Sequence, residues 1–287
     1  MTIEAQPNVE QTAAWDGPLF ERMLRFKYVI VTGPRPHSDK ALALYPPPEG
    51  GAVLDVGCGF GDVTERIAAL IGPAGHAHGV DVSARFIEEC RAGVEAPNTS
   101  FSVGDVQFDD LGGPYDFVFS RFGVMFFDNP GAAMRNIRRS MAPGARLVAV
   151  VWRIREDNEW VYGAQRIVER MLGRPTEYDE PTCGPGPFSM AGADTTSGIL
   201  VGAGFTEVTL TRSDIPLLIG RDVEEALDLV MALGPAGEII RLWGDRKAHR
   251  TDEVRDALRE HLAALQTDAG VEGMASTWIV SAISPPA

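Results

Sequence analysis

The chain has 287 residues, of which 45% are hydrophobic and 23% are charged, a composition that supports a globular core. Its length fits two domains, or one large α/β domain with an added helical part. Forty acidic residues against 26 basic ones give a net charge of −14. A protein that binds the nucleic-acid backbone needs a basic face, so this charge argues against RNA or DNA as a partner.

Cysteine usage and hydropathy indicate the cellular compartment. The three cysteines, Cys58, Cys90 and Cys183, form no CxxC pair, which argues against a disulfide framework or a structural zinc site. Residues 1–10 are polar and contain no apolar core of a signal peptide. The apolar strip 147–152 is too short to cross a membrane. We therefore expect a reducing, cytoplasmic protein without a membrane span.

The first half of the chain alternates between short apolar runs and amphipathic segments. Residues 1–14 look loose, and residues 15–45 have helical spacing interrupted by prolines. Strands are predicted at 52–56, 76–80, 99–103, 115–120 and 146–152. Helices are predicted at 62–71, after a Ser83 cap, and from Asn129-Pro130 to a stop at Pro143-Gly144, with Met134, Ile137 and Met141 inward. This order predicts a parallel, doubly wound α/β sheet with right-handed crossovers.

The second half has longer helical stretches. Residues 159–172 are amphipathic, residues 173–192 are a Pro- and Gly-rich loop, and a helix near 194–203 precedes a strand at 205–211. Two further helices, with faces at 223–231 and 254–265, come before a last strand at 276–281. We predict three parts: an N-terminal helical cap segment (1–45), a cofactor-binding core (46–152), and the remainder of the sheet with helical inserts that form a substrate cap (153–287).

A glycine-rich turn lies between the first predicted strand and the first helix, where open α/β sheets bind ligands. It reads Asp55-Val-Gly57-Cys58-Gly59-Phe-Gly61. Glycine lets the backbone turn sharply and approach a ligand closely. The Asp55 carboxylate at the strand end can bind an ammonium group or order water beside it.

The glycine spacing distinguishes two cofactors. A dinucleotide site requires G-x-G-x-x-G, whereas this turn reads G-x-G-x-G and places Asp62 at the third glycine of that pattern. A carboxylate there would repel a pyrophosphate at the helix N-terminus. A sulfonium cofactor with an α-amino group meets no such repulsion. The spacing therefore favours S-adenosylmethionine over NAD.

Three further strand ends carry candidate cofactor contacts. Asp81, followed by Val82, stands 20 residues beyond Gly61 and can accept both ribose hydroxyls, a feature that NAD sites share. Asp105 can accept from an adenine amino group, and Val106 can contact the ring. The end of the fourth strand contributes the remaining candidates, Ser120, Arg121 and Phe122.

With these motifs, residues 52–152 resemble class I S-adenosylmethionine-dependent methyltransferases, especially the group that includes ubiquinone and menaquinone biosynthesis methyltransferases. The Asp55–Gly61 turn matches the first motif of the family; Asp81, Asp105 and the 141–147 turn match later ones, although Ala145 replaces a common glycine. Trp15-Asp16-Gly17 and the 120–127 stretch are also similar. The resemblance implies a seven-stranded, mostly parallel Rossmann-like sheet whose last strand is antiparallel. The last hundred residues match only loosely.

Candidate acceptor contacts are less specific. Aromatic side chains that can line a substrate pocket are Trp15, Phe20, Tyr28, Phe126 and Trp152, although aromatic residues more often form cores. His37 is a candidate base for a hydroxyl acceptor, because it lies in a segment that can close over the cofactor. No catalytic base is assigned. Cys58 has no base nearby in sequence, and His76-x-His78 has no further ligand spaced to complete a metal site, so we predict no metal.

We therefore interpret the chain as an S-adenosylmethionine-dependent methyltransferase that acts on a small-molecule acceptor by in-line transfer, releasing S-adenosylhomocysteine. Three alternatives stay open: an NAD-dependent oxidoreductase, a non-catalytic S-adenosylmethionine-binding protein, and a methyltransferase with a protein acceptor. The sequence leaves open the acceptor atom, the pathway, and the choice between monomer and homodimer.

Overall fold

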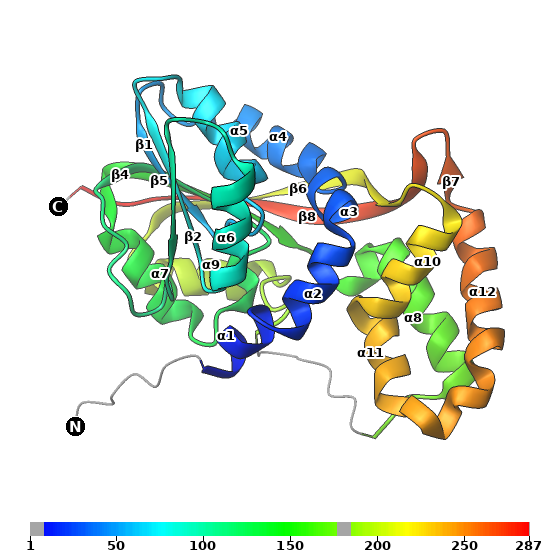
Figure 1. The fold of residues 1–287 in the computed structure, drawn as a ribbon. Coiled ribbons are helices and arrows are strands. Elements are labelled where there is room, and N and C mark those ends of the chain that lie inside the picture. The colour runs from blue at the N-terminus through cyan, green and yellow to red at the C-terminus, as the bar shows by residue number, and fades with distance from the viewer. Residues whose placement is uncertain (1–8, 177–184, 287) are drawn as a thin grey trace.

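A computed structural model describes residues 9–176 and 185–286 (Figure 1). Its centre is one sheet with the strand order β3-β2-β1-β4-β5-β8-β6, and the short β7 pairs with β8 off this path. Among the described strands, the pairings of β8 with β5, β6 and β7 are antiparallel and the others are parallel. The mostly parallel α/β fold is thereby confirmed, and the sheet has eight strands rather than the seven expected, because the two-residue β7 adds to β8. The strands are β1 Ala52–Val56, β2 His76–Asp81, β3 Thr99–Val103, β4 Tyr115–Arg121, β5 Met141–Trp152, β6 Thr206–Gly220, β7 Gln266–Thr267 and β8 Gly270–Ile283.

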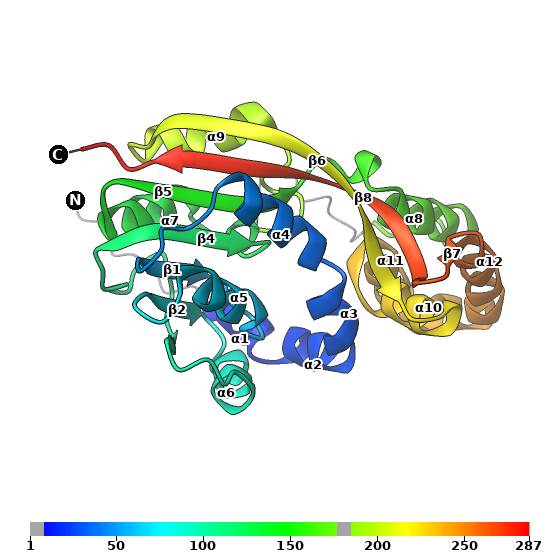
Figure 2. The same cartoon turned by 90° about the horizontal axis from the view of Figure 1, so that it is seen from above.

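Helices cover both faces of this sheet. On one face α4 (Arg35–Leu44) and α5 (Asp62–Ile71) pack against alternate strand residues such as Phe117 and Phe119. On the other face α7 (Pro130–Arg139) and α9 (Ala193–Gly202) pack against the intervening residues such as Val118. α6 (Ala84–Gly93) lies along β2 and β3. The strands fan out side by side between these helices (Figure 2). Their carboxyl ends are thereby brought to one edge, where open α/β sheets bind ligands.

Local sequence signals explain several helix starts. Ser83 Oγ accepts from the Phe86 amide, so the predicted cap of α6 is confirmed. Asn129 caps α7 in the same way, with Pro130 as its first residue. Pro36 stands in the first turn of α4, where its missing N–H costs no helical hydrogen bond. Prolines of the 34–36 stretch therefore start a helix rather than only interrupting one.

The N-terminal segment is more ordered than its sequence predicts. The sequence predicts a loose segment at residues 9–14, but α1 spans Val9–Trp15, followed by α2 (Pro18–Arg25) and α3 (Lys27–Thr32). Tertiary packing explains the difference, because α1 and α2 contact each other and aromatic side chains of this segment pack on the core. Isolated helices of this length are marginal in water and depend on such contacts.

A helical bundle lies at one end of the sheet. It consists of α8 (Glu159–Leu172), α10 (Val223–Ala232), α11 (Gly234–Trp243) and α12 (Thr251–Ala263), joined in part by a 3₁₀ segment (Gly244–Arg250). These helices share an apolar core with the ends of β6 and β8. The sequence predicts only two helices between β6 and β8. The sequence does not predict α11, because Gly234, Pro235 and Gly237 are typical of a turn, although Pro235 lies at the helix start.

Three strand limits differ from prediction. β5 begins at Met141 rather than at 146, and α7 ends at Arg139, so Met141 belongs to the sheet and not to the inner face of the helix. Pairing of Met141 with Tyr115, before a register irregularity, extends the strand. β6 and β8 are longer than predicted, because they continue to pair with each other beyond the end of β5. Within residues 9–176 and 185–286, no helix is long and apolar enough to span a membrane.

Candidate functional site

The loops after β1 and β4 touch at the carboxyl edge of the sheet. Gly57 has φ 69°, and a Cβ built there would lie 2.9 Å from the Gly123 Cα. Gly59 has φ 54°, and a Cβ there would meet no atom within 4 Å. Glycine at 57 thus permits two backbones to meet, whereas Gly59 borders open space. A ligand can occupy this space and approach the protein backbone of the turn closely.

Asp81 stands beside that space at the end of β2. One carboxylate oxygen accepts from the Gly59 amide at 3.0 Å, and the other accepts from the Ser83 amide at 3.0 Å. Burial raises the pKa of Asp81, and the amide hydrogen bonds oppose this rise. Each carboxylate oxygen can accept more than one hydrogen bond, so Asp81 retains acceptor capacity for a pair of hydroxyl groups.

Asp55 lies beneath the glycine turn rather than in the open space. Its side chain is buried, and its carboxylate accepts from Thr64 Oγ1 at 2.6 Å. Burial raises the pKa of Asp55 to about 7, against a lowering by the Thr64 hydrogen bond. The carboxyl group is therefore poised to lose its proton when a cation arrives above it. A direct contact of Asp55 with an ammonium group stays a prediction.

Arg121, at the end of β4, forms a bidentate ion pair with Asp62. Both nitrogen–oxygen distances are 2.9 Å, and the two side chains are only 11% and 14% exposed. Arg121 also donates to Ser38 Oγ at 3.3 Å, which ties the turn to α4. Because Arg121 neutralises Asp62, the predicted repulsion of a pyrophosphate by that carboxylate does not hold. The glycine spacing remains as the argument against a dinucleotide.

The remaining candidates of the cofactor set occupy two environments. Ser120 and Cys58 are buried, and Ser120 Oγ donates to the Val56 carbonyl at 2.8 Å, which joins β4 to β1. Asp105 is part-exposed and accepts from the Gln107 amide at 2.9 Å, while Val106 is buried in the core. Val82 is part-exposed beside Asp81. Asp105 and Val82 are thus accessible to a nucleoside, and Ser120 supports the backbone behind it.

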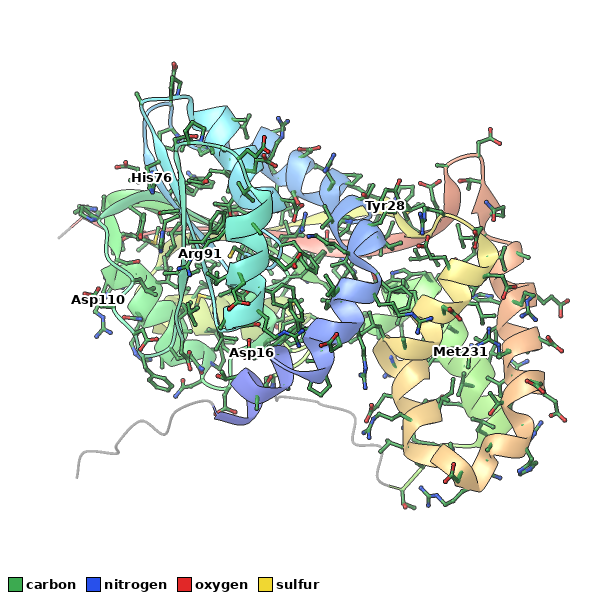
Figure 3. The ribbon with its side chains drawn as sticks, in the orientation of Figure 1. Asp16, Tyr28, His76, Arg91, Asp110 and Met231 are labelled. Carbon is green, nitrogen blue, oxygen red and sulfur yellow. The ribbon has the colours of Figure 1, made fainter. Side chains whose placement is uncertain are left out.

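The N-terminal helices cover this edge. Asp16, labelled in Figure 3, accepts from Ser83 Oγ at 2.8 Å and from the Arg85 amide at 3.0 Å, at the start of α6. Phe20 packs edge-to-face on Phe86 at 4.9 Å. Nearby, Trp15 packs edge-to-face on Phe126, also at 4.9 Å. α1 and α2 are therefore attached to the loops that border the open space.

A second cluster lies at the ends of β4 and β5, on the α4 side. Phe122 and Trp152 stack with 4.0 Å between ring centroids, and the His37 ring stands edge-on to both at 6.3 and 6.1 Å. Trp160 of α8 adds a ring 6.1 Å from Trp152. Phe122 has φ 61°, a strained conformation for a bulky residue that is typical of functional sites. We call His37, Phe122, Trp152 and Trp160 the aromatic cluster.

The structure separates some of the predicted acceptor residues. Tyr28 is 51% exposed and lies under the Arg221 guanidinium, toward the β6–α10 connection (Figure 3), apart from the aromatic cluster. Phe20 is buried in its own aromatic contacts. Trp160 was missed because one tryptophan on an amphipathic helix looks like core. Thr64 was missed because it lies on a predicted helix without any motif.

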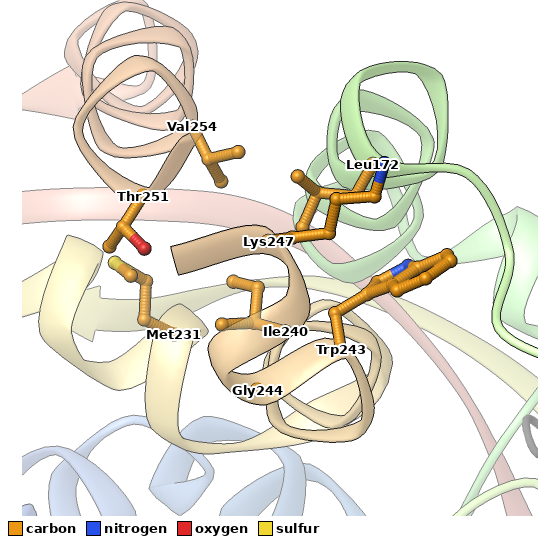
Figure 4. A pocket seen from close by; sticks show the side chains of 8 residues that line it. All are labelled: Leu172, Met231, Ile240, Trp243, Gly244, Lys247, Thr251 and Val254. Carbon is orange, nitrogen blue, oxygen red and sulfur yellow. The ribbon is translucent and has the colours of Figure 1, made fainter. Parts of the chain in front are cut away.

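Two cavities lie elsewhere. The pocket shown in Figure 4 holds about 20 Å³ among α8, α11 and α12, which is room for one water molecule. A cavity of about 280 Å³ opens beside β3, lined in part by His78, Ser102 and Tyr115. His76 and His78 bond to Ser100 and Ser102 there. In the part of the chain that the structure describes, no group of three His, Cys, Asp or Glu residues is placed to hold a metal ion.

Comparison with known proteins agrees with this geometry. Residues 53–144 match a family described as a methyltransferase domain. The chain is 30% identical over 106 residues to the ubiquinone/menaquinone biosynthesis C-methyltransferase of Pseudomonas paraeruginosa, a match covering 35% of this chain and 41% of that protein. Residues 53–144 therefore carry a methyltransferase domain, and their likeness is to class I S-adenosylmethionine-dependent methyltransferases. The first curated relatives are each matched over less than half of their own length.

Solved structures extend the likeness of this methyltransferase domain to most of the chain. The YcgJ protein of Bacillus subtilis superposes with a TM-score of 0.54 at 16% identity, covering 88% of this chain and 99% of that one. Phosphoethanolamine N-methyltransferase 2 of Haemonchus contortus, in complex with S-adenosyl-L-methionine, gives 0.59 at 16% identity, covering 96% and 60%. At identities this low, the likeness shows only that this chain shares the fold of these structures.

Proposed function

We propose that the chain transfers a methyl group from S-adenosylmethionine to a small-molecule acceptor. One observation carries the proposal: open space at Gly59 adjoins a part-exposed carboxylate, Asp81, whose oxygens keep acceptor capacity. A ribose needs such an acceptor for its two hydroxyls, and a close-approaching backbone suits the methionine part of the cofactor. The residues present therefore fit this group.

Each part of the edge has an expected task in this proposal. Asp81 holds the ribose hydroxyls, Asp105 accepts from the adenine amino group beside the part-exposed Val82, and the Gly57–Gly61 backbone holds the methionine part. When bound, S-adenosylmethionine supplies a methyl group on a positively charged sulfur, and the carbon–sulfur electron pair stays with sulfur as the acceptor's lone pair forms the new bond. The chain itself orients both partners and, with α1 and α2 in place, keeps water out.

The acceptor space lies, in this proposal, at the aromatic cluster. The cluster is adjacent to the turn, because Phe122 precedes Gly123, and Gly123 contacts Gly57. His37 within the cluster is fully buried, so a folded macromolecule does not reach this side chain. The net charge of −14 adds an argument against RNA. A small acceptor fits both observations.

Isothermal titration calorimetry tests the cofactor part of this proposal. The dialysed protein is titrated with S-adenosylhomocysteine and, separately, with NADH. We expect binding of S-adenosylhomocysteine alone; binding of NADH alone would reject the methyltransferase. Turnover is then measured as S-adenosylhomocysteine release from S-adenosylmethionine with a panel of hydroxyl, amine and thiol compounds. Binding with no release from any of these classes would favour a non-catalytic S-adenosylmethionine-binding protein.

A further inference from the structure

His37 is a fully buried histidine with a partner on only one ring nitrogen. It belongs to α4, and its Nδ1 lies 3.2 Å from Oγ1 of Thr277, which belongs to β8, 240 residues away. Its Nε2 is buried and has no hydrogen-bond partner among the residues that the structure describes. A buried polar atom without a partner costs free energy, which is regained when a ligand supplies the missing hydrogen bond.

The contacts of Thr277 determine which ring nitrogen carries the hydrogen. Thr277 Oγ1 lies 3.2 Å from the Ser213 carbonyl oxygen, which can only accept. Thr277 therefore donates its single hydrogen to Ser213, and its oxygen must accept from Nδ1–H of His37. A neutral imidazole has one N–H, so Nε2 carries a lone pair. His37 thus offers a hydrogen-bond acceptor at its unpartnered nitrogen.

The charges around His37 keep the ring neutral. Burial, together with the positive charges of Lys40 and Arg121, lowers the pKa of His37 to about 4. The carboxylate beside Arg121, that of Asp62, is held by both guanidinium nitrogens of Arg121. The same positive charges disfavour an ammonium group beside the ring. An uncharged ligand with a donor hydrogen is the better complement.

The walls next to His37 define the rest of that ligand. Phe122 and Trp152 present a stacked pair whose side chains remain part-exposed, and the Nε1 of Trp160 is buried without a partner within the described ranges. Aromatic faces prefer to contact flat rings. An acceptor at His37 beside these rings suits a hydroxyl-bearing ring, because a hydroxyl group donates one hydrogen.

We propose, on the basis of the function proposed above, that the acceptor is an uncharged ring-bearing hydroxyl compound and that His37 Nε2 accepts its hydroxyl hydrogen during O-methylation. The acceptor oxygen forms the new bond to the methyl carbon, and its proton moves to Nε2 and leaves to water with the product. Thr277 is a positioning residue, because it fixes the Nδ1–H form of His37 without touching the acceptor.

Nitrogen-15 NMR of the histidine rings tests this proposal without a known acceptor. His37 is assigned by the signals that vanish in His37→Gln. We expect an Nδ1–H, Nε2-unprotonated ring at pH 7, which Thr277→Ser retains and Thr277→Val converts to a mixture or to Nε2–H. A wild-type ring protonated at Nε2, or a Thr277→Val spectrum identical to that of wild type in the folded variant, would overturn the role of Thr277.

Two probe molecules test the ligand class. The Nε2 signal of protein saturated with S-adenosylhomocysteine is followed during addition of 2-naphthol or 2-methoxynaphthalene, which has the same ring without the hydroxyl hydrogen. We expect a shift with 2-naphthol only. No shift with 2-naphthol, or an equal shift with the ether, would overturn the hydroxyl assignment. Failure to bind S-adenosylhomocysteine in the calorimeter would instead reject the proposed function, while the ring signals still report the state of His37.

Discussion

The two halves of the carboxyl edge are built in different ways. The cofactor half, formed by the loops after β1, β2 and β3, depends on backbone groups and short carboxylates, such as the Gly59 amide on Asp81, 22 residues apart. The acceptor half, the aromatic cluster with Thr277, depends on side chains such as His37, which meets a residue 240 positions away. Local backbone geometry suits the cofactor, which is the same in every protein that uses it. Long-range side-chain contacts can vary, so the acceptor can differ among proteins of one fold.

The largest expected effect in the cofactor half is a pH dependence of stability due to Asp55. Its pKa is raised from 3.8 to about 7, so the folded protein holds this proton while the unfolded chain has lost it. The resulting stability is fully present below pH 4 and is lost as the pH rises to 7, by up to about 4 kcal/mol.

Urea unfolding at pH 4 to 7 measures this dependence. Asp55→Asn cannot titrate, so we expect its free energy of unfolding to change less over this range than that of wild type. Equal pH dependence in the two proteins would mean that Asp55 ionises freely beneath the turn.

Gly57→Ala should produce the next largest effect. A Cβ at 57 would lie 2.9 Å from the Gly123 Cα, and the backbone has a positive φ. We expect a loss of about 3 kcal/mol in the free energy of unfolding, because overpacking adds to backbone strain. Gly144→Ala is the matched control, since Gly144 has φ 80° and a Cβ built there meets no atom within 4 Å. Equal losses in thermal or urea unfolding would show that the two loops separate easily.

Asp81→Asn should weaken S-adenosylhomocysteine binding about 100-fold, because hydrogen bonds to a charged acceptor contribute about 1.5–3 kcal/mol each. Calorimetry measures this effect. Asp110→Asn serves as the control, since Asp110 accepts a local amide hydrogen bond from Gly112 and lies beside the cavity at β3. If both variants bind like wild type, Asp81 does not hold the ribose.

The smallest effect is expected for the acceptor half. Trp152→Phe keeps an aromatic ring beside Phe122 and should change the dissociation constant of S-adenosylhomocysteine by less than about twofold. The same calorimetric titration measures it. A tenfold increase in this dissociation constant would mean that Trp152 contacts the cofactor, and the two halves would then not be separate.

The same division explains how much the sequence predicted. The sheet, its order of strands and helices, and the glycine turn could be predicted because they depend on local periodicity and on glycine spacing. The Arg121–Asp62 ion pair and the contact of His37 with Thr277 could not, because each joins elements that only the tertiary fold brings together. α11 was hidden for a different reason: its glycines favour turns, and packing in the bundle overrides that preference.

The long pairing of β6 with β8 has a mechanical consequence. Residues 277–283 of β8 pair with β5 in the main sheet, whereas its residues before 277 pair with β6 as a two-stranded ribbon that ends in the core of the helical bundle. Bundle and sheet therefore share continuous strands, so a swing of the bundle has to twist this ribbon. Thr277 and Ser213 sit where the ribbon leaves the sheet. The contact between Thr277 and His37 therefore lies at the junction of the bundle and the sheet.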